Sequence, residues 1–314
     1  MPPSGSAQPG RRAPVALALG ALYLIWGSTY FAIRVALEGF PPLLMAGSRF
    51  VLAGGLLYAA ARLQGAHPPG PAQWRSGAIV GSLLCAANGL VTVSEQWVSS
   101  SVAAVVVASV PLWTVLVAGL WRERPTPREV AGLGVGLAGV VLLQAGGELR
   151  AHPLGAALLV LSTWSWALGS MWSRRLSLAP GLMAPATEML AGGTLLMAAA
   201  LARGERLAAL PGPRPLAAWV FLTLFGSLVA FTAYNFLLRR VRPALATSYA
   251  YVNPAVAVAL GALAGEAVGP RALGALGLIL AGVGIVAAGR GPAAAAPSEA
   301  RPPGPPSGRV APRR

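Results

Sequence analysis

Two ionisable side chains stand within long apolar stretches of this chain. Arg49 lies seven residues into one stretch, and Glu188 lies seven residues into another. A charge surrounded by hydrocarbon is costly, so such residues are functional candidates by default. We predict that Glu188, the one carboxylate well inside a stretch, carries a proton or contacts the amine of a ligand. The two side chains could meet only if their helices are neighbours. The alternative for both is a structural ion pair or a side chain that extends to the membrane surface.

A second group of residues combines aromatic rings with a few hydrogen-bonding groups. Such a set suits small, partly apolar solutes and offers no site for several phosphates. Each member alone could equally serve a helix-helix contact, so only their convergence on one cavity would assign them to a ligand. The predicted substrate-binding residues are Trp26, Ser28, Tyr30, Asn88, Trp166, Tyr234, Tyr249 and Asn253.

Four further residues occur as two pairs with one spacing. Pro111 and Pro254 each fall in the middle of an apolar stretch, where proline removes an amide donor and frees the carbonyl four residues earlier. Glu123 and Glu266 each follow their proline by twelve residues and lie among arginines. We predict gating roles for both pairs. A packed kink and loop ion pairs are the alternatives.

The sequence argues against catalysis. It contains no aspartate and no lysine, and its two histidines, His67 and His152, lie apart from each other and outside the apolar stretches. An intramembrane aspartyl protease, a His-Glu-x-x-His zinc protease and a serine-histidine dyad therefore lack their residues, and no phosphate-binding glycine loop occurs. We predict no catalytic residue, no metal site and no cofactor.

Composition places the chain in a bilayer. Hydrophobic residues make up 55%, charged residues 11%, and the mean hydropathy is +0.64, whereas charged residues reach about 25% in soluble domains. The net charge of +15 comes from arginines that punctuate apolar segments, without the stripes and exposed aromatics of a nucleic-acid site. The single cysteine, Cys85, excludes an intrachain disulfide. The expected partners are the lipid bilayer and a small-molecule substrate, with no nucleic acid.

Ten segments are long and apolar enough to cross a hydrocarbon core about 30 Å thick. Helices are expected because backbone amides in lipid must be satisfied within the segment, and no alternating barrel pattern occurs. The fold class is therefore an all-α integral membrane protein of ten transmembrane helices. The segments span residues 15–36, 42–61, 75–94, 98–121, 129–145, 153–172, 181–202, 216–238, 244–263 and 272–289.

The chain also contains a duplication. A shift of 143 residues superposes Pro111 on Pro254 and Glu123 on Glu266, and a shift of 140 superposes Trp26 on Trp166. Five spans per copy is an odd number, so the second copy enters the membrane from the opposite side. We expect two inverted five-helix repeats, at residues 15–145 and 153–289.

Arginine distribution predicts the orientation. Seventeen arginines lie in the tails and the loops on the side of the N-terminus, and five lie in the opposite loops, so both termini are expected in the cytoplasm. Residues 1–14 form an N-terminal cytoplasmic tail, and the first span is read as uncleaved because it is too long for a signal peptide. Residues 290–314 are rich in Pro, Ala, Gly and Arg, which predicts a disordered basic tail.

Several motifs resemble a known family. They are Leu24 to Phe31, Met45 to Phe50, Ala103 to Leu112, Ala246 to Pro254 and Gly265-Glu266. In this order the chain resembles an EamA-type member of the drug/metabolite transporter superfamily, similar to the YedA-type inner-membrane exporters of bacteria. The resemblance covers residues 15 to 289 and implies a basket of ten helices that exports small metabolites such as amino acids, sugars, purines or drugs.

Together these features predict a secondary active exporter in the inner membrane that works by alternating access, with proton coupling through Glu188 as a hypothesis. The alternatives are a lipid or amphipath flippase, a passive channel, and a receptor that binds without flux. Faces of small residues serve internal packing and a homodimer alike, so the sequence leaves the oligomeric state open.

Overall fold

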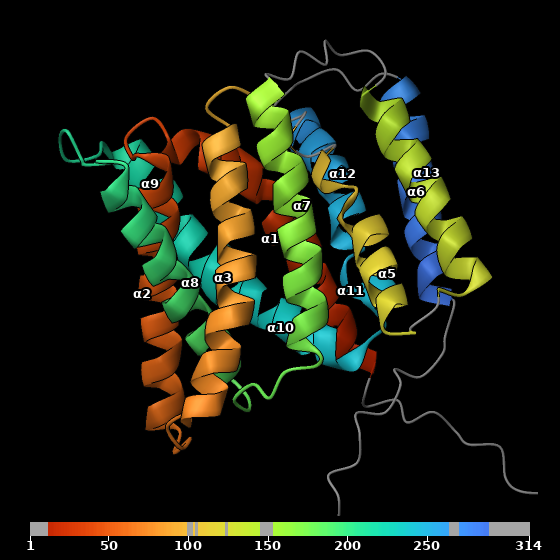
Figure 1. Cartoon of the computed structure of the whole chain (residues 1–314). Helices are drawn as coiled ribbons and strands as arrows, with labels where there is room; N and C mark the ends of the chain where they lie inside the picture. The colour runs from red at the N-terminus through yellow and green to blue at the C-terminus, as the bar shows by residue number, and fades with distance from the viewer. Residues whose placement is uncertain are drawn as a thin grey trace, which may run out of the picture.

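The computed structural model describes residues 12–98, 103, 106–122, 125–144, 153–263 and 270–288. Within these ranges every regular element is helical (Figure 1). The tails before Arg12 and after Ala288 lie outside the described residues, and their predicted character stays a prediction. The helices are α1 (Arg12–Ala36), α2 (Pro42–Leu63), α3 (Pro71–Ser94), α5 (Val110–Leu120), α6 (Pro127–Gln144), α7 (Pro153–Ser173), α8 (Met183–Ala202), α9 (Pro213–Phe221), η2 (Leu222–Val229), α10 (Ala230–Arg240), α11 (Pro243–Ala246), α12 (Tyr249–Leu263) and α13 (Pro270–Ala288).

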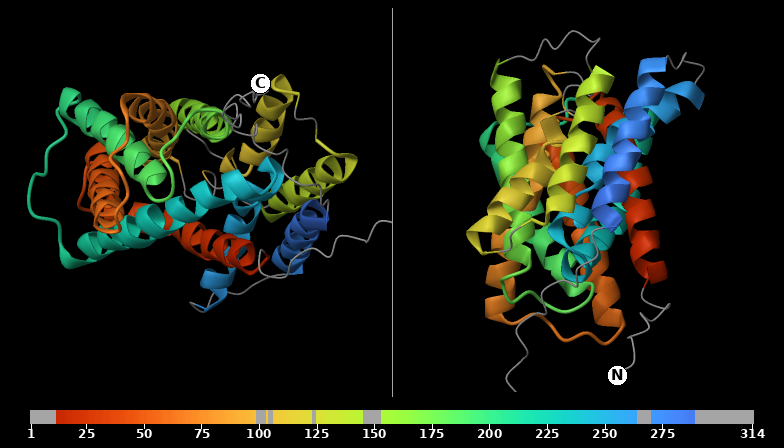
Figure 2. Two further views of the ribbon diagram at one scale, coloured as in Figure 1. Left: turned by 90° about the horizontal axis from the view of Figure 1, so that it is seen from below. Right: turned by 90° about the vertical axis from the view of Figure 1, so that its right-hand side faces the viewer.

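Proline marks where many of these helices start. It is the first residue of α2, α3, α6, α7, α9, α11 and α13. At this position proline loses no hydrogen bond, because the first amides of a helix have no partner within it, and its fixed φ angle suits the helix. The helices run side by side, and the loops between them lie at the two ends of the bundle, as the right-hand view of Figure 2 shows.

Six of the helices are long and apolar enough to cross a membrane. They are Ala13–Ala36, Pro42–Leu63, Pro71–Ser94, Pro153–Ser173, Met183–Ala202 and Pro213–Arg240, the last formed by α9, η2 and α10 in succession. They agree with the first, second, third, sixth, seventh and eighth expected spans. The other four expected segments contain α5, α6, α11 with α12, and α13, which are not among the six. The count of ten spans therefore stays a prediction.

Close backbone approaches hold the bundle together. Helix α3 packs on α7 and α8, α2 packs on α8, and α6 packs on α13. A Cβ atom on Gly192 would lie 2.2 Å from the Gly81 carbonyl oxygen, and one on Gly282 would lie 2.5 Å from the Gly136 amide nitrogen. Glycine lets helices approach this closely, which increases van der Waals contact where no hydrophobic force drives association.

Large apolar side chains also cover the outside of the bundle. Leu17, Leu24 and Phe31 on α1 are each more than 60% exposed, and Phe225 on η2 is 47% exposed. An outer surface of this kind fits hydrocarbon and would be a liability in water. The described chain is therefore a helical bundle of the integral membrane class.

Three irregularities interrupt the helices near the centre of the bundle. A turn at Ala108 and Ser109 precedes α5, a break at Thr247 and Ser248 separates α11 from α12, and η2 has the wider π-helical pitch. The sequence predicted a proline inside a helix in both repeats. Pro254 does lie inside α12, but Pro111 is the second residue of α5, where proline starts a helix and does not kink one.

Candidate binding cavity

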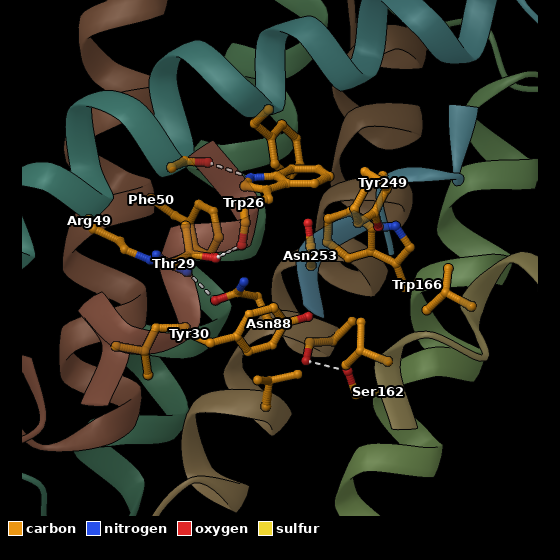
Figure 3. Close-up of a pocket in the computed structure, with 17 residues that line it drawn as sticks. Trp26, Thr29, Tyr30, Arg49, Phe50, Asn88, Ser162, Trp166, Tyr249 and Asn253 are labelled. Carbon is orange, nitrogen blue, oxygen red and sulfur yellow. Dashed lines mark hydrogen bonds between the residues drawn. The ribbon is translucent and has the colours of Figure 1, made fainter. Parts of the chain in front are cut away.

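The helices enclose a cavity with an empty volume of about 640 Å³, counting the space at its mouth, and η2 and the residues next to the two helix interruptions contribute to its wall. Residues before position 145 supply one part of its wall: Trp26, Thr29, Tyr30 and Ile33 of α1, Arg49 and Phe50 of α2, Ala87, Asn88 and Val91 of α3, with Val107 and Val110. Residues after position 152 supply the other: Ser162 and Trp166 of α7, Gly226 of η2, Phe231 of α10, with Tyr249 and Asn253 of α12. Both regions of the chain thus meet at one hollow (Figure 3).

Four rings form an aromatic cluster at one side of the cavity, namely Trp26, Trp166, Tyr234 and Tyr249. The ring centroid of Trp26 lies 4.5 Å from that of Tyr249 and 5.4 Å from that of Trp166, both in edge-to-face arrangements. Behind the wall, Trp166 Nε1 donates a hydrogen bond of 3.0 Å to the Tyr234 hydroxyl, which also pairs with the Ser170 hydroxyl at 2.6 Å. These contacts fix the orientation of the rings that face the cavity.

The π-helical segment η2 positions Trp26. The carbonyl oxygen of Gly226 accepts a hydrogen bond of 3.0 Å from Trp26 Nε1. A Cβ atom on Gly226 would lie 3.2 Å from Thr29 Cγ2, so glycine keeps this wall close to α1. Short π-helical segments occur frequently at functional sites, because the altered pitch redirects backbone groups.

Polar groups occupy the opposite side. Arg49 is 2% exposed, its Nη2 donates to Asn88 Oδ1, and its guanidinium carbon lies 4.7 Å from the ring centroid of Phe50. Asn253 lies nearer to Tyr249 and Trp166, and its buried Oδ1 accepts no hydrogen bond from the described residues. The cavity therefore offers a cation, an acceptor and aromatic faces to a single ligand.

The structure brings most of the predicted binding residues together. Trp26, Tyr30, Asn88, Trp166, Tyr249 and Asn253 line the cavity, and so does Arg49. Tyr234 lies directly behind the wall as part of the aromatic cluster. Ser28 is the exception, since its hydroxyl donates to the Ile25 carbonyl oxygen at 2.7 Å on its own helix and does not line the cavity.

Of the predicted coupling and gating residues, Arg49 lines the cavity, and the other described ones do not. Glu188 is fully buried on α8, where its Oε2 accepts a hydrogen bond of 2.8 Å from Asn235 Nδ2, and it does not line the cavity. Helices α2 and α8 are neighbours, which a contact between Arg49 and Glu188 would require. The two side chains are nevertheless hydrogen-bonded to other residues, Arg49 to Asn88 and Glu188 to Asn235. Pro111 and Pro254 each follow a lining residue, Val110 and Asn253. Glu123 and Glu266 lie outside the described residues.

Sequence reasoning missed Glu95. It follows the last residue of α3, is 8% exposed, and neither of its carboxylate oxygens accepts a hydrogen bond from the described residues. Its position just after an apolar span is typical of a solvated loop residue, so nothing in the pattern signalled burial. Phe50, Gly226 and Phe231 were missed for a similar reason, because the sequence does not reveal which faces of these helices turn inward.

The described helices form a membrane bundle around a cavity, and the comparisons with known proteins give the class of membrane protein. The EamA-like transporter family matches residues 14–144 and, separately, residues 153–288. The chain therefore belongs to the EamA-like transporter family, and this membership indicates a transporter and not an enzyme.

Two relatives are similar over most of their length. The chain is 48% identical over 280 residues to the "Uncharacterized inner membrane transporter YedA" of Escherichia coli strain K12, covering 88% of this chain and 92% of the relative. It is 30% identical over 284 residues to the "Probable terminal-alkyne amino-acid exporter" of Streptantibioticus cattleyicolor, covering 86% of this chain and 92% of that protein. The predicted resemblance to the EamA-type and YedA-type proteins is confirmed.

A solved structure supports the fold alone. A crystal structure superposes with a TM-score of 0.73 at 23% identity and covers 88% of this chain and 97% of that chain. The arrangement of helices is thus shared with an experimentally determined protein.

Proposed function

We propose that this protein is a secondary active exporter that carries small solutes across the inner membrane by alternating access. The observation that carries the proposal is the cavity, whose wall comes from both regions that match the family, residues 14–144 and 153–288. A solute site between two related halves lets one half rock against the other around the bound solute.

The architecture that we propose has ten spans in two inverted five-helix repeats, residues 15–145 and 153–289. Trp26 and Trp166, which the shift of 140 residues superposes, meet edge to face in the cavity wall, and this supports an internal pseudo-symmetry. The excess of arginine on one side supports cytoplasmic placement of both termini.

The proposed substrates are amino acids or drug-like solutes. Aromatic faces with a few amide and hydroxyl groups suit a partly apolar solute. The relative from Streptantibioticus cattleyicolor bears the name of an amino-acid exporter, which favours amino acids.

Counterflow in proteoliposomes tests this function. The vesicles are loaded with one unlabelled solute from a panel of amino acids, sugars, purines and cationic drugs, and a trace of labelled solute is added outside. We expect saturable, transient accumulation of one class. A passive channel would give flux without saturation or counterflow, and a lipid flippase would accumulate no soluble solute while moving labelled lipid between leaflets.

The Glu188 carboxylate is the proposed coupling group. Glu188→Gln keeps the size of the side chain and an oxygen that can accept from Asn235, but it cannot carry a proton. We expect this variant to retain counterflow and to lose the effect of an imposed pH gradient on net export. Glu205→Gln, outside the predicted spans, is the matched control. An unchanged pH effect in Glu188→Gln would remove Glu188 from the mechanism.

A further inference from the structure

Arg49 is a buried cation without a counter-ion among the described residues. Its side chain lies on α2 at the cavity wall, yet the ion pairs found in the described part of the chain involve other arginines. Its Nε donates no hydrogen bond there. A buried charge without a partner is strongly destabilising, so its retention needs a reason.

The neighbours of Arg49 are neutral. Asn88 accepts one of its N–H groups and Phe50 contributes its ring face, whereas a guanidinium has five N–H donors in a planar fork. Figure 3 shows the Arg49 side chain reaching toward Asn88 inside the cavity. The guanidinium therefore keeps donors for a ligand.

Two buried carboxylates lie in the same part of the bundle, and neither pairs with Arg49. Glu188 is hydrogen-bonded to Asn235. Glu95 interacts electrostatically with Arg49, but the two form no ion pair within 4 Å. A negative charge brought by the solute would complete the site.

The opposite wall fits an apolar group. Trp26, Trp166 and Tyr249 present ring surfaces there, and Asn253 Oδ1 adds an acceptor that the described residues leave unused. Figure 3 places Arg49 and Phe50 on one side of the hollow and Trp166 and Tyr249 on the other. The cavity is therefore polarised, with a cation at one side and aromatic rings at the other.

We infer that Arg49 and Asn88 form a carboxylate subsite, and that the cavity takes organic monocarboxylates whose apolar or aromatic body lies against Trp26, Trp166 and Tyr249. The inference rests on the proposed function and specifies its substrate class. A carboxylate binds the guanidinium fork through two parallel hydrogen bonds, which also orient the solute. An α-amino acid satisfies the same rule, with its ammonium group donating to Asn253 Oδ1. A plain amine does not, because it brings a second positive charge to Arg49.

The test measures binding to the purified, detergent-solubilised full chain by calorimetry. The probes are 3-phenylpropionate, 3-phenylpropionamide and 3-phenylpropylamine, which share one body and differ in charge. We expect the carboxylate to bind the wild type at least about tenfold more tightly than either analogue, because charge-assisted bidentate hydrogen bonds are roughly twice as strong as neutral ones. Equal or tighter binding of the amine, or no binding by any of a series of aliphatic and aromatic monocarboxylates, overturns the subsite.

Two variants test whether the positive charge of Arg49 binds the carboxylate of the solute. Arg49→Gln removes it, and Asn88→Asp keeps Arg49 but gives it a carboxylate from the protein itself that competes with the solute. We expect each to weaken carboxylate binding about tenfold or more. Arg62→Gln, at the exposed end of the same helix, is the control and is expected to bind as the wild type does. If Arg49→Gln fails to fold, Asn88→Asp decides the matter alone, and unchanged or tighter carboxylate binding by that variant overturns the subsite.

Counterflow with the same probes separates this inference from the proposed function. Binding of the carboxylate with the expected variant pattern, but without exchange, would support the subsite and contradict the exporter. Exchange of amines or neutral solutes with no binding of carboxylates would support the exporter and contradict the subsite.

Discussion

Glu95 holds two carboxylate oxygens in a buried place with no hydrogen bond from the described residues. It follows the last residue of α3 and so lies outside the spanning helix. Burial raises the pKa of Glu95 to about 8, and the positive charges of Arg34 and Arg49 oppose this rise. The Tyr30 hydroxyl on α1 also interacts with it electrostatically. Near neutral pH the folded protein therefore binds a proton that the unfolded chain releases.

A pH dependence of stability follows at this residue. The folded pKa exceeds the ordinary value of 4.5, so the contribution of Glu95 is fully present below pH 4.5 and is lost as pH rises toward 8. We expect the melting temperature of the wild type, relative to that of Glu95→Gln, to fall between pH 5 and pH 8 in detergent. Glu38→Gln, which removes an exposed carboxylate, is the control. A constant difference across this range would contradict a protonated Glu95.

Among elements, α3 and α8 cross with glycines of each helix against the backbone of the other. A Cβ atom on Gly81 would lie 2.0 Å from the Glu188 carbonyl oxygen, and Gly192 meets the Gly81 carbonyl in return. Both contacts are with backbone, which cannot rotate away as a side chain can. The separation of the two helices is therefore set by glycine, and with it the position of Asn88 and Glu188, which these helices carry.

Substitution at this crossing should be costly. Gly192→Ala would place a methyl group 2.2 Å from the Gly81 carbonyl oxygen and 2.6 Å from Cys85, so the helices must separate. We expect a loss of about 1 to 3 kcal/mol, the usual cost of overpacking, measured as a lower melting temperature. Gly55→Ala on α2, where a Cβ would meet no atom within 4 Å, is the control and should be neutral or slightly stabilising. Equal effects of the two substitutions would contradict a backbone-limited crossing.

At the scale of the whole molecule, a partly buried ion pair between Arg242 and Glu129 links the two regions that match the family. Arg242, just before α11, donates from Nε to Glu129 Oε1 and from Nη2 to Glu129 Oε2, the latter at 2.9 Å. Glu129 stands in the first turn of α6, where its Oε2 also accepts from the Thr126 amide at 2.7 Å. In the orientation that we propose, with both termini in the cytoplasm, this contact lies at the cytoplasmic end and joins the two regions there.

Loss of the ion pair between Arg242 and Glu129 should make the cavity more accessible from the proposed cytoplasmic side. In a Cys85→Ala background, Val110→Cys supplies the only thiol and lines the cavity. We expect Glu129→Gln to raise its labelling rate by a water-soluble maleimide about tenfold in inside-out vesicles, because loss of a partly buried pair of about 1.4 kcal/mol or more shifts a two-state equilibrium by that factor. Glu38→Gln, which removes the exposed pair with Arg214, is the control. An unchanged labelling rate would assign the Glu129 pair to structure alone.

The sequence predicted some of these features well and others poorly, for identifiable reasons. Length and hydropathy predicted the six spanning helices, because both are properties of a segment by itself. The aromatic and amide residues of the cavity were predicted because they combine aromatic rings with hydrogen-bonding groups inside apolar stretches, and most of them do line the cavity. The burial of Glu95 and the distance of Glu188 from the cavity could not be predicted, because a helix that is apolar on all sides shows no pattern that defines its inward face. The π-helical pitch of η2 is equally invisible, since its residues differ little from those of any apolar helix.

The internal similarity also affects how amino-acid substitutions can alter the cavity wall. Val110 and Asn253 are counterparts at the shift of 143 residues, each precedes a proline, and both face the cavity. The prolines at the two equivalent positions are the same, whereas the residues before them differ, one a hydrocarbon and the other an amide. The two regions that match the family thus supply different residues at equivalent positions of the wall, and a single substitution alters one of them while its counterpart is preserved. A substitution in one region can therefore change which solutes bind, while the wall supplied by the other region keeps its contacts.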